Sequence, residues 1–299
     1  MLVKISDHLS FLISEAGFTY CNCVLIDDDI RAILDTGADK GSLDAINPAS
    51  IDMVINTHHH YDHTRGNMFF DKAQIYIHSL DYNALQSREE NIIYNSIDSW
   101  DELMPGQKYN EAAAIMGIHE AEVEKNLRAD HKLADKQIID FGHTRMEVIH
   151  TPGHSAGHCS FWFPREEFLF TGDICLTQAG PWYGEIYADP EEMIKSINTI
   201  IDLNPPRMTS CHINEICYNG RERLIEFRDR IDKREERILN YLKRQPADVH
   251  MIAAEKLIYR MHPTPFVLFW EKLMVIKHLQ RLLQARRIEM VENGLYRVC

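Results

Sequence analysis

The most constraining feature of this 299-residue chain is a histidine-rich run at residues 57–63, Thr-His-His-His-Tyr-Asp-His. An apolar run at residues 51–56 precedes it and has the length of a buried strand. Side chains alternate along an extended segment, so His58 and His60 share one side. Imidazoles with carboxylate oxygen suit zinc, manganese or iron better than calcium or magnesium. The residues that predict a site for one or two such ions are His58, His60, Asp62 and His63.

Three later segments each place a histidine or an aspartate after a strand-like run. They read Thr-Pro-Gly-His-Ser-Ala-Gly-His at 151–158, Thr-Gly-Asp at 171–173 and Ser-Cys-His at 210–212. The Pro-Gly pair marks a tight turn that projects His154. A surface turn would explain one pair of histidines, but here the later segments supply the missing ligands.

Together with Ile-Leu-Asp-Thr-Gly at residues 33–37, these segments stand in the order of the five motifs of the metallo-β-lactamase-fold superfamily, which residues 1 to about 215 resemble. Within it the chain resembles the group of glyoxalase II, lactonases and β-lactamase-like protein 2. The resemblance implies an α/β fold, a four-layer αββα sandwich. It also implies a catalytic domain at residues 1–246.

The resemblance further implies two divalent metal ions, which we expect to be zinc, with manganese or iron as alternatives. The expected ligands are His58, His60 and His154 for the first ion, Asp62, His63 and His212 for the second, and Asp173 as a bridge. Asp35 is expected to orient a ligating imidazole, a role that metal sites generally require. The alternative is that Asp35 only caps a turn.

Water bound to such ions loses a proton near neutral pH, and the ions polarise the bond to be cleaved. We therefore expect a dinuclear metal-dependent hydrolase that uses a metal-activated hydroxide, and the resemblance implies that its substrate is a small thioester, ester or lactone. Asp62 would position or deprotonate the water. Trp182 and Tyr183 are expected to line the substrate pocket, with packing as the alternative. The apolar-aromatic stretch at 178–184 argues against glutathione thioesters, because the glyoxalase II branch has basic residues there.

Two segments depart from a compact member of the superfamily. Residues 80–136 are polar with helical periodicity, which predicts an insertion that serves as a lid, a pocket wall or a dimer contact. Residues 247–299 predict two helices and a hairpin, because Asn293-Gly294 separates two alternating runs. This pattern resembles a winged-helix module.

The charge of the chain bears on its binding partners, and its cysteine content bears on its location in the cell. The net charge is −13, whereas residues 247–299 carry eight Lys and Arg against five Asp and Glu. The acidic body argues against a general nucleic-acid binder, so a structural or dimerising module and a small-molecule substrate are favoured. An endoribonuclease that binds RNA through the module is the alternative, followed by an iron-dependent sulfur dioxygenase. Scattered cysteines and the lack of a membrane-length apolar run predict a cytoplasmic protein without membrane contact.

Overall fold

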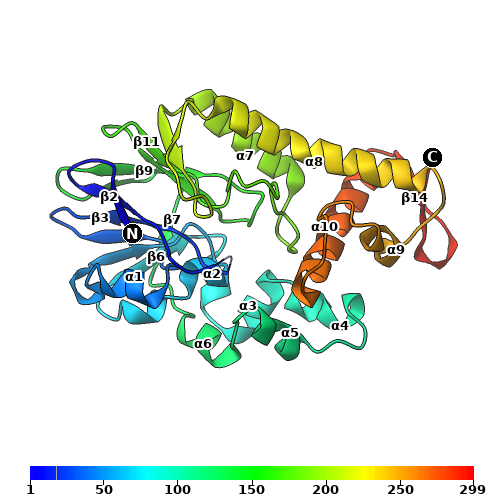
Figure 1. Cartoon of the computed structure of the whole chain (residues 1–299), viewed down its shortest axis with the longest axis horizontal. Helices are drawn as coiled ribbons and strands as arrows, with labels where there is room; N and C mark the ends of the chain where they lie inside the picture. Colours follow the sequence, from blue (N-terminus) through cyan, green and yellow to red (C-terminus); the bar gives the residue numbers. More distant parts are fainter. Residues whose placement is uncertain (18) are drawn as a thin grey trace.

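A computed structural model describes residues 1–17 and 19–299 and contains two large sheets (Figure 1). The first sheet has seven strands in sequence order, antiparallel from β1 to β4 and parallel from β4 to β7. Its strands are β1 (Leu2–Lys4), β2 (Leu9–Leu12), β3 (Cys23–Ile26), β4 (Ala32–Leu34), β5 (Met53–Ile55), β6 (Gln74–His78) and β7 (His131–Leu133).

The second sheet has the order β13-β12-β11-β10-β9-β8, and only its β11–β12 pair is parallel. Its strands are β8 (Ile138–Asp140), β9 (Arg145–His150), β10 (Cys159–Phe163), β11 (Phe168–Phe170), β12 (Arg207–Thr209) and β13 (Cys217–Tyr218). Because β9 and β11 both run antiparallel to β10, the strands β9, β11 and β12 point in one direction. The loops that follow them therefore lie at the same edge of the sheet.

Alternation along β11 shows how the layers form. Phe168 and Phe170 join the apolar cluster between the two sheets, whereas Leu169 joins the cluster formed with α7 (Pro190–Leu203) and α8 (Arg221–Leu242). On the other side of the molecule, α1 (Lys40–Asp44) packs on the first sheet through Leu43 (Figure 1). The structure thus confirms the expected four-layer αββα sandwich.

The 80–136 segment consists of short helices and ends in a strand of the first sheet. Its helical elements are η3 (Tyr82–Leu85), α3 (Arg88–Tyr94), η4 (Ile97–Ser99), α4 (Trp100–Leu103), α5 (Tyr109–Ile115) and α6 (Glu120–Lys125). The strand β7 pairs in parallel with β6, so the last part of this segment belongs to the sheet. Three more short helices lie earlier in the chain: η1 (Pro48–Ser50), α2 (Tyr61–Thr64) and η2 (Asn67–Phe69).

The C-terminal module has the element order expected from its sequence, helix, helix and hairpin. Its elements are α9 (Val249–Ala254), α10 (Pro265–Gln284), β14 (Ile288–Met290), η5 (Glu292–Gly294) and β15 (Tyr296–Val298). The hairpin turns at Asn293 and Gly294, both with positive φ. The winged-helix assignment itself stays a prediction.

The helix α10 packs against the 80–136 segment (Figure 1). Phe266 and Phe269 of α10 share an apolar cluster with Trp100, Leu103 and Met104. The module and the 80–136 segment therefore support each other. Among the described residues, no helix is long and apolar enough to cross a membrane.

Candidate metal centre

All the residues nominated as ligands or as their orienting partner follow the carboxyl ends of strands. Asp35 follows β4, and the histidine-rich run follows β5 and continues into α2. His154, Asp173 and His212 follow β9, β11 and β12, whose ends share one edge of the second sheet. The two sheets thus bring segments from residue 35 to residue 212 to one place.

Three imidazole nitrogens converge in what we call the first donor set, His58, His60 and His154. The His60 Nδ1 atom lies 2.9 Å from His58 Nε2 and 2.9 Å from His154 Nε2. The two Nε2 atoms of His58 and His154 are 3.1 Å apart. All three side chains are buried or nearly so.

The second ring nitrogen of each imidazole faces an oxygen acceptor. His154 Nδ1 donates to the Trp182 carbonyl at 3.0 Å, and His60 Nε2 lies 2.7 Å from Glu185 Oε1. His58 Nδ1 lies 2.9 Å from Thr57 Oγ1, whose own hydrogen goes to Asp35 Oδ2. The hydrogen bonds of His58 and His154 place the proton on this nitrogen, and the nearby Glu185 carboxylate favours the same tautomer of His60, so that three lone pairs point at one another. Such an arrangement fits a cation that accepts all three lone pairs.

A second donor set, Asp62, His63, His212 and Asp173, adjoins the first. His212 Nε2 lies 3.3 Å from Asp62 Oδ2 and 3.2 Å from Asp173 Oδ1. His63 Nε2 lies 3.6 Å and 3.3 Å from the same two oxygens. Burial alone would raise the pKa of both carboxyls, but the neighbouring imidazoles hold each pKa well below its usual value. Both carboxylates are therefore ionised, as metal ligands must be.

Asp173 connects the two sets. Its Oδ1 faces the second set, whereas its Oδ2 lies 3.3 Å from His154 Nε2 of the first. The backbone N–H of Asp173 donates to His158 Nε2 at 2.8 Å, so His158 positions this residue. The geometry suits a carboxylate shared by two ions, and the donor chemistry fits divalent metal binding.

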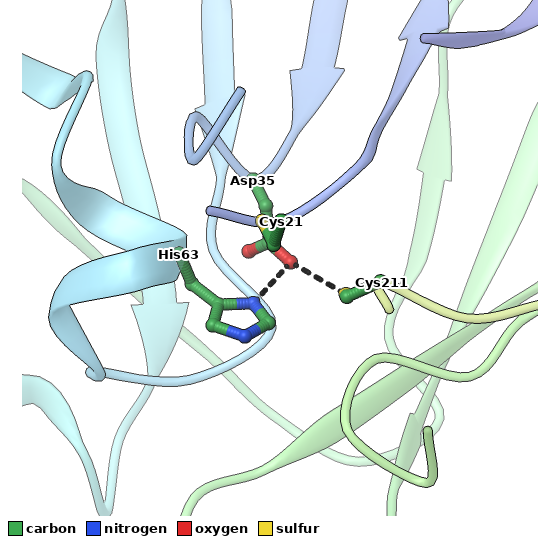
Figure 2. Close-up of side chains that lie close together, drawn as sticks. All are labelled: Cys21, Asp35, His63 and Cys211. Atoms are coloured by element: carbon green, nitrogen blue, oxygen red, sulfur yellow. Dashed lines mark hydrogen bonds and ion pairs between the residues drawn. The ribbon is translucent and has the colours of Figure 1, made fainter. Parts of the chain in front are cut away.

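Asp35 lies behind the second set and accepts four hydrogen bonds. The donors are Thr57 N at 2.8 Å, Thr57 Oγ1 at 2.9 Å, His63 Nδ1 at 2.9 Å and Cys211 Sγ at 3.4 Å. Figure 2 shows Asp35 between the His63 ring and Cys211, with Cys21 beside it. The His63 contact places the proton on Nδ1 and leaves the Nε2 lone pair for the second set.

The spacing of the sequence motifs did not indicate that Cys211 contacts Asp35. Burial raises the pKa of the Cys211 and Cys21 thiols well above the ordinary value, so both stay protonated. A protonated Cys211 can donate to the carboxylate.

Nearby, Gly37 is required because a Cβ there would lie 1.6 Å from the Asp62 carbonyl oxygen. The turn after β4 thus packs directly against the helix that carries Asp62.

A buried ion-pair network lies beside the first set and was missed by sequence reasoning. His59 Nδ1 lies 3.0 Å from Asp81 Oδ2, and His59 Nε2 lies 3.4 Å from Glu185 Oε2. Burial alone would lower the pKa of His59, but these carboxylates raise it to about 10. Glu185 contacts both His59 and His60, and although burial raises its pKa, the two imidazoles lower it to about 2. Asp81 and Glu185 lie outside every recognised motif, so no sequence pattern marked them.

The two aromatic residues nominated for the substrate pocket occupy different environments. The half-buried Trp182 ring lies 5.3 Å from the His60 ring and 5.4 Å from the His154 ring, measured between centroids. Tyr183 is fully buried, and its hydroxyl lies 3.0 Å from His278 Nε2. Trp182 therefore lies against the first set, whereas the position of Tyr183 fits the packing alternative.

Comparisons with known proteins agree with this geometry. The family model described as Metallo-beta-lactamase superfamily matches residues 16–212. A Beta-lactamase-like protein 2 homolog from Drosophila melanogaster is 24% identical over 242 residues, which cover 78% of this chain and 72% of that protein. A Hydroxyacylglutathione hydrolase from Brucella anthropi is 30% identical over 155 residues, which cover 52% of this chain and 44% of that protein.

Solved structures share the fold across the whole chain. A metallo-beta-lactamase family protein from Thermus thermophilus superposes with a TM-score of 0.81 at 19% identity, covering 99% of this chain and 100% of that one. A beta-lactamase domain protein from Burkholderia ambifaria gives a TM-score of 0.76 at 16% identity, covering 100% of this chain and 93% of that one. The chain therefore belongs to the metallo-β-lactamase superfamily.

Proposed function

We propose that this protein is a metal-dependent hydrolase that cleaves a small carboxylic thioester, ester or lactone at a centre of two zinc ions. The observation that carries the proposal is the placement of Asp173. Its two oxygens lie 3.2 to 3.3 Å from imidazole nitrogens of both donor sets. A carboxylate shared between two adjoining donor sets can bridge the two ions of a dinuclear centre.

In this proposal the first ion is held by His58, His60 and His154, and the second by Asp62, His63 and His212. When bound, the ions supply an activated water near neutral pH and polarise the carbonyl oxygen of the substrate. Asp62 is the catalytic carboxylate. Its side chain is 28% exposed, so it faces the approach of a substrate more than its partners do. Its Oδ2 faces His63 and His212, which leaves Oδ1 to accept a hydrogen bond or a proton from the attacking water.

Two observations support a small carboxylic substrate. Several curated relatives are named hydroxyacylglutathione hydrolases, at 24% to 30% identity, and the chain spans about half of their length. The Trp182 ring next to His60 offers an apolar surface at the centre. A basic side chain is absent from residues 178–184, all of them described, so a glutathione moiety finds no cationic partner in that stretch.

The packing of α10 weighs against the alternative of an RNA substrate. A recognition helix needs an exposed face that enters a groove. Of the twenty residues of α10, all of them described, just Gln280 and Gln284 are exposed. This helix is therefore an internal support of the fold, which agrees with a structural role for the C-terminal module.

Two measurements test the proposal. Elemental analysis of untagged protein purified without added metal should give about two zinc ions per chain. The same protein is then assayed with an acyl thioester, an aryl ester, a lactone and single-stranded RNA. One iron per chain together with sulfur-oxidising activity would refute the proposal and indicate a sulfur dioxygenase. Cleavage of RNA and of none of the other substrates would refute it and indicate an endoribonuclease.

The variant Asp62→Ala tests the site itself. Loss of a general base costs about 10²- to 10⁴-fold in rate, and loss of a ligand adds to this. The matched control is Asp71→Ala, which removes an exposed carboxylate shortly after the same motif. Turnover of Asp62→Ala within a few-fold of the control would refute the assignment of Asp62.

A further inference from the structure

The loop between β11 and α7 provides acceptors for two of the three imidazoles in the first donor set. The Trp182 carbonyl accepts from His154 Nδ1 at 3.0 Å, and Glu185 Oε1 lies 2.7 Å from His60 Nε2. The hydrogen bond to the Trp182 carbonyl places the proton of His154 on Nδ1, and the carboxylate 2.7 Å from His60 Nε2 favours a proton on that nitrogen. The same loop therefore determines which nitrogen of His60 and of His154 presents its lone pair.

Glu185 is well suited to this task because it is buried and held on both sides. Its side chain is 5% exposed, and its second oxygen, Oε2, lies 3.4 Å from His59 Nε2. His59 is bound in turn to Asp81, whose carboxylate accepts from Ser155 Oγ and the Gly157 N–H, each at 2.6 Å. The chain of contacts leaves the Glu185 carboxylate little freedom to rotate.

The backbone next to Glu185 is braced from the C-terminal module and from the 80–136 segment. Lys277 of α10 donates its Nζ to the Ile186 carbonyl at 2.9 Å and to the Ala188 carbonyl at 2.7 Å. The Ile186 N–H donates to Ser96 Oγ at 2.8 Å. A single side chain of α10 thus links the carbonyls of the first and third residues after Glu185.

We propose that Glu185 is a positioning residue that presents His60 Nδ1 to the first metal position, and that Lys277 holds the Glu185 loop in place. The proposal rests on the first donor set of the proposed function. It assigns the C-terminal module a role in metal retention, through a loop that lies about 90 residues away from Lys277 in sequence.

The informative variant is Glu185→Gln, which keeps the size of the side chain. The carboxylate presents one oxygen to His59 Nε2 and the other to His60 Nε2, whereas an amide has a single oxygen and must turn its NH₂ group toward one of these two nitrogens. Loss of such a partner of a metal-bound histidine lowers metal affinity by about 10- to 100-fold. We expect that loss for the first zinc and no change in the second. Lys277→Met keeps the aliphatic stem and should give a smaller loss in the same direction.

Zinc affinity is measured by competition with a chromophoric zinc chelator, using the full chain. The matched control is Glu222→Gln, which removes one exposed carboxylate at the start of α8. Nitrogen-15 imidazole NMR of the metal-free chain gives an independent readout. The wild-type spectrum should show His60 protonated at Nε2, and Glu185→Gln should shift the ring toward the Nδ1-protonated form.

His60→Ala separates failure of this proposal from failure of the proposed function. If His60→Ala still binds two zinc ions as tightly as the wild type, the first donor set is wrong. If His60→Ala loses one zinc while Glu185→Gln matches Glu222→Gln, the positioning role alone is wrong. Equal weakening of both zinc positions in Glu185→Gln would make Glu185 a structural residue and overturn the proposal. If Lys277→Met binds zinc as tightly as the wild type, the proposal that Lys277 of α10 holds the Glu185 loop is wrong.

Discussion

Replacing Asp35 by Asn should weaken the second metal position selectively. Asp35 has φ 57°, in the left-handed region, and Asn is one of the few residues that adopts it readily. The substitution therefore changes charge and hydrogen bonding with little effect on the backbone. The wild-type carboxylate receives donors on both oxygens, three on Oδ2 and the Thr57 N–H on Oδ1.

The expected loss in free energy of unfolding follows from these four hydrogen bonds to Asp35. The cheaper orientation of the amide keeps its oxygen at the Oδ2 position and turns its NH₂ group toward the Thr57 N–H. That buried N–H then loses its acceptor, which costs about 1–3 kcal/mol. The remaining contact to His63 also loses its charge, so we expect the free energy of unfolding to fall by about 2–4 kcal/mol in total. Zinc affinity at the second position should fall by about 10- to 100-fold.

Urea unfolding of the metal-free chain, followed by circular dichroism, measures the stability change. Chelator competition measures the two zinc affinities separately. Asp71→Asn, at an exposed position, is the control for removal of one carboxylate. A metal-free Asp35→Asn within about 0.5 kcal/mol of the control, with both zinc affinities unchanged, would show that Asp35 only caps the turn after β4.

Three other predictions use parts of the fold away from the centre. Partial burial raises the pKa of Asp39, but hydrogen bonds led by the Ser42 hydroxyl lower it to about 2, below the ordinary 3.8. The advantage of wild type over Asp39→Asn, about 1 kcal/mol after solvent screening, should therefore persist above pH 3.8 and fade as the pH falls toward 2, as urea midpoints would show. A constant difference across this range would contradict the assigned pKa. Six of the seven cysteines are buried and Cys299 is exposed, so a thiol reagent should label about one thiol in the native chain and all of them in denaturant. Rapid labelling of several native thiols would mean that the core opens. Trp100→Ala removes a side chain that is 1% exposed and packs on Phe266 and Phe269, which should cost about 3–5 kcal/mol in thermal or urea unfolding. A cost below about 1 kcal/mol would mean that the contact between α4 and α10 contributes little.

Much of the metal centre was visible in the sequence because each nominated residue follows a strand-like run. The position of a residue after a strand is a local property, and parallel strands bring such positions to a common edge. This is why the seven residues nominated as ligands lie in two adjoining sets in the structure. The C-terminal elements were visible for the same reason, since Asp248, Thr264 and Asn293 act through short-range caps and turns.

The partners of these residues were decided by the tertiary structure. Glu185 is an isolated carboxylate in a loop, and it approaches His60 Nε2 across 125 residues of sequence. The Trp182 carbonyl contacts His154 across 28 residues, and the Cys211 thiol contacts Asp35 across 176 residues.

The packing partners of α10 likewise could not be predicted from the sequence of the helix itself. The apolar residues of a helix predict that it is buried, but they do not predict which part of the protein packs against it. Periodicity and caps are encoded within a few residues, so sequence determined the elements and the nominated ligands. Acceptors for buried N–H groups come from whichever segment the fold brings near, so the tertiary structure decided how those ligands are held.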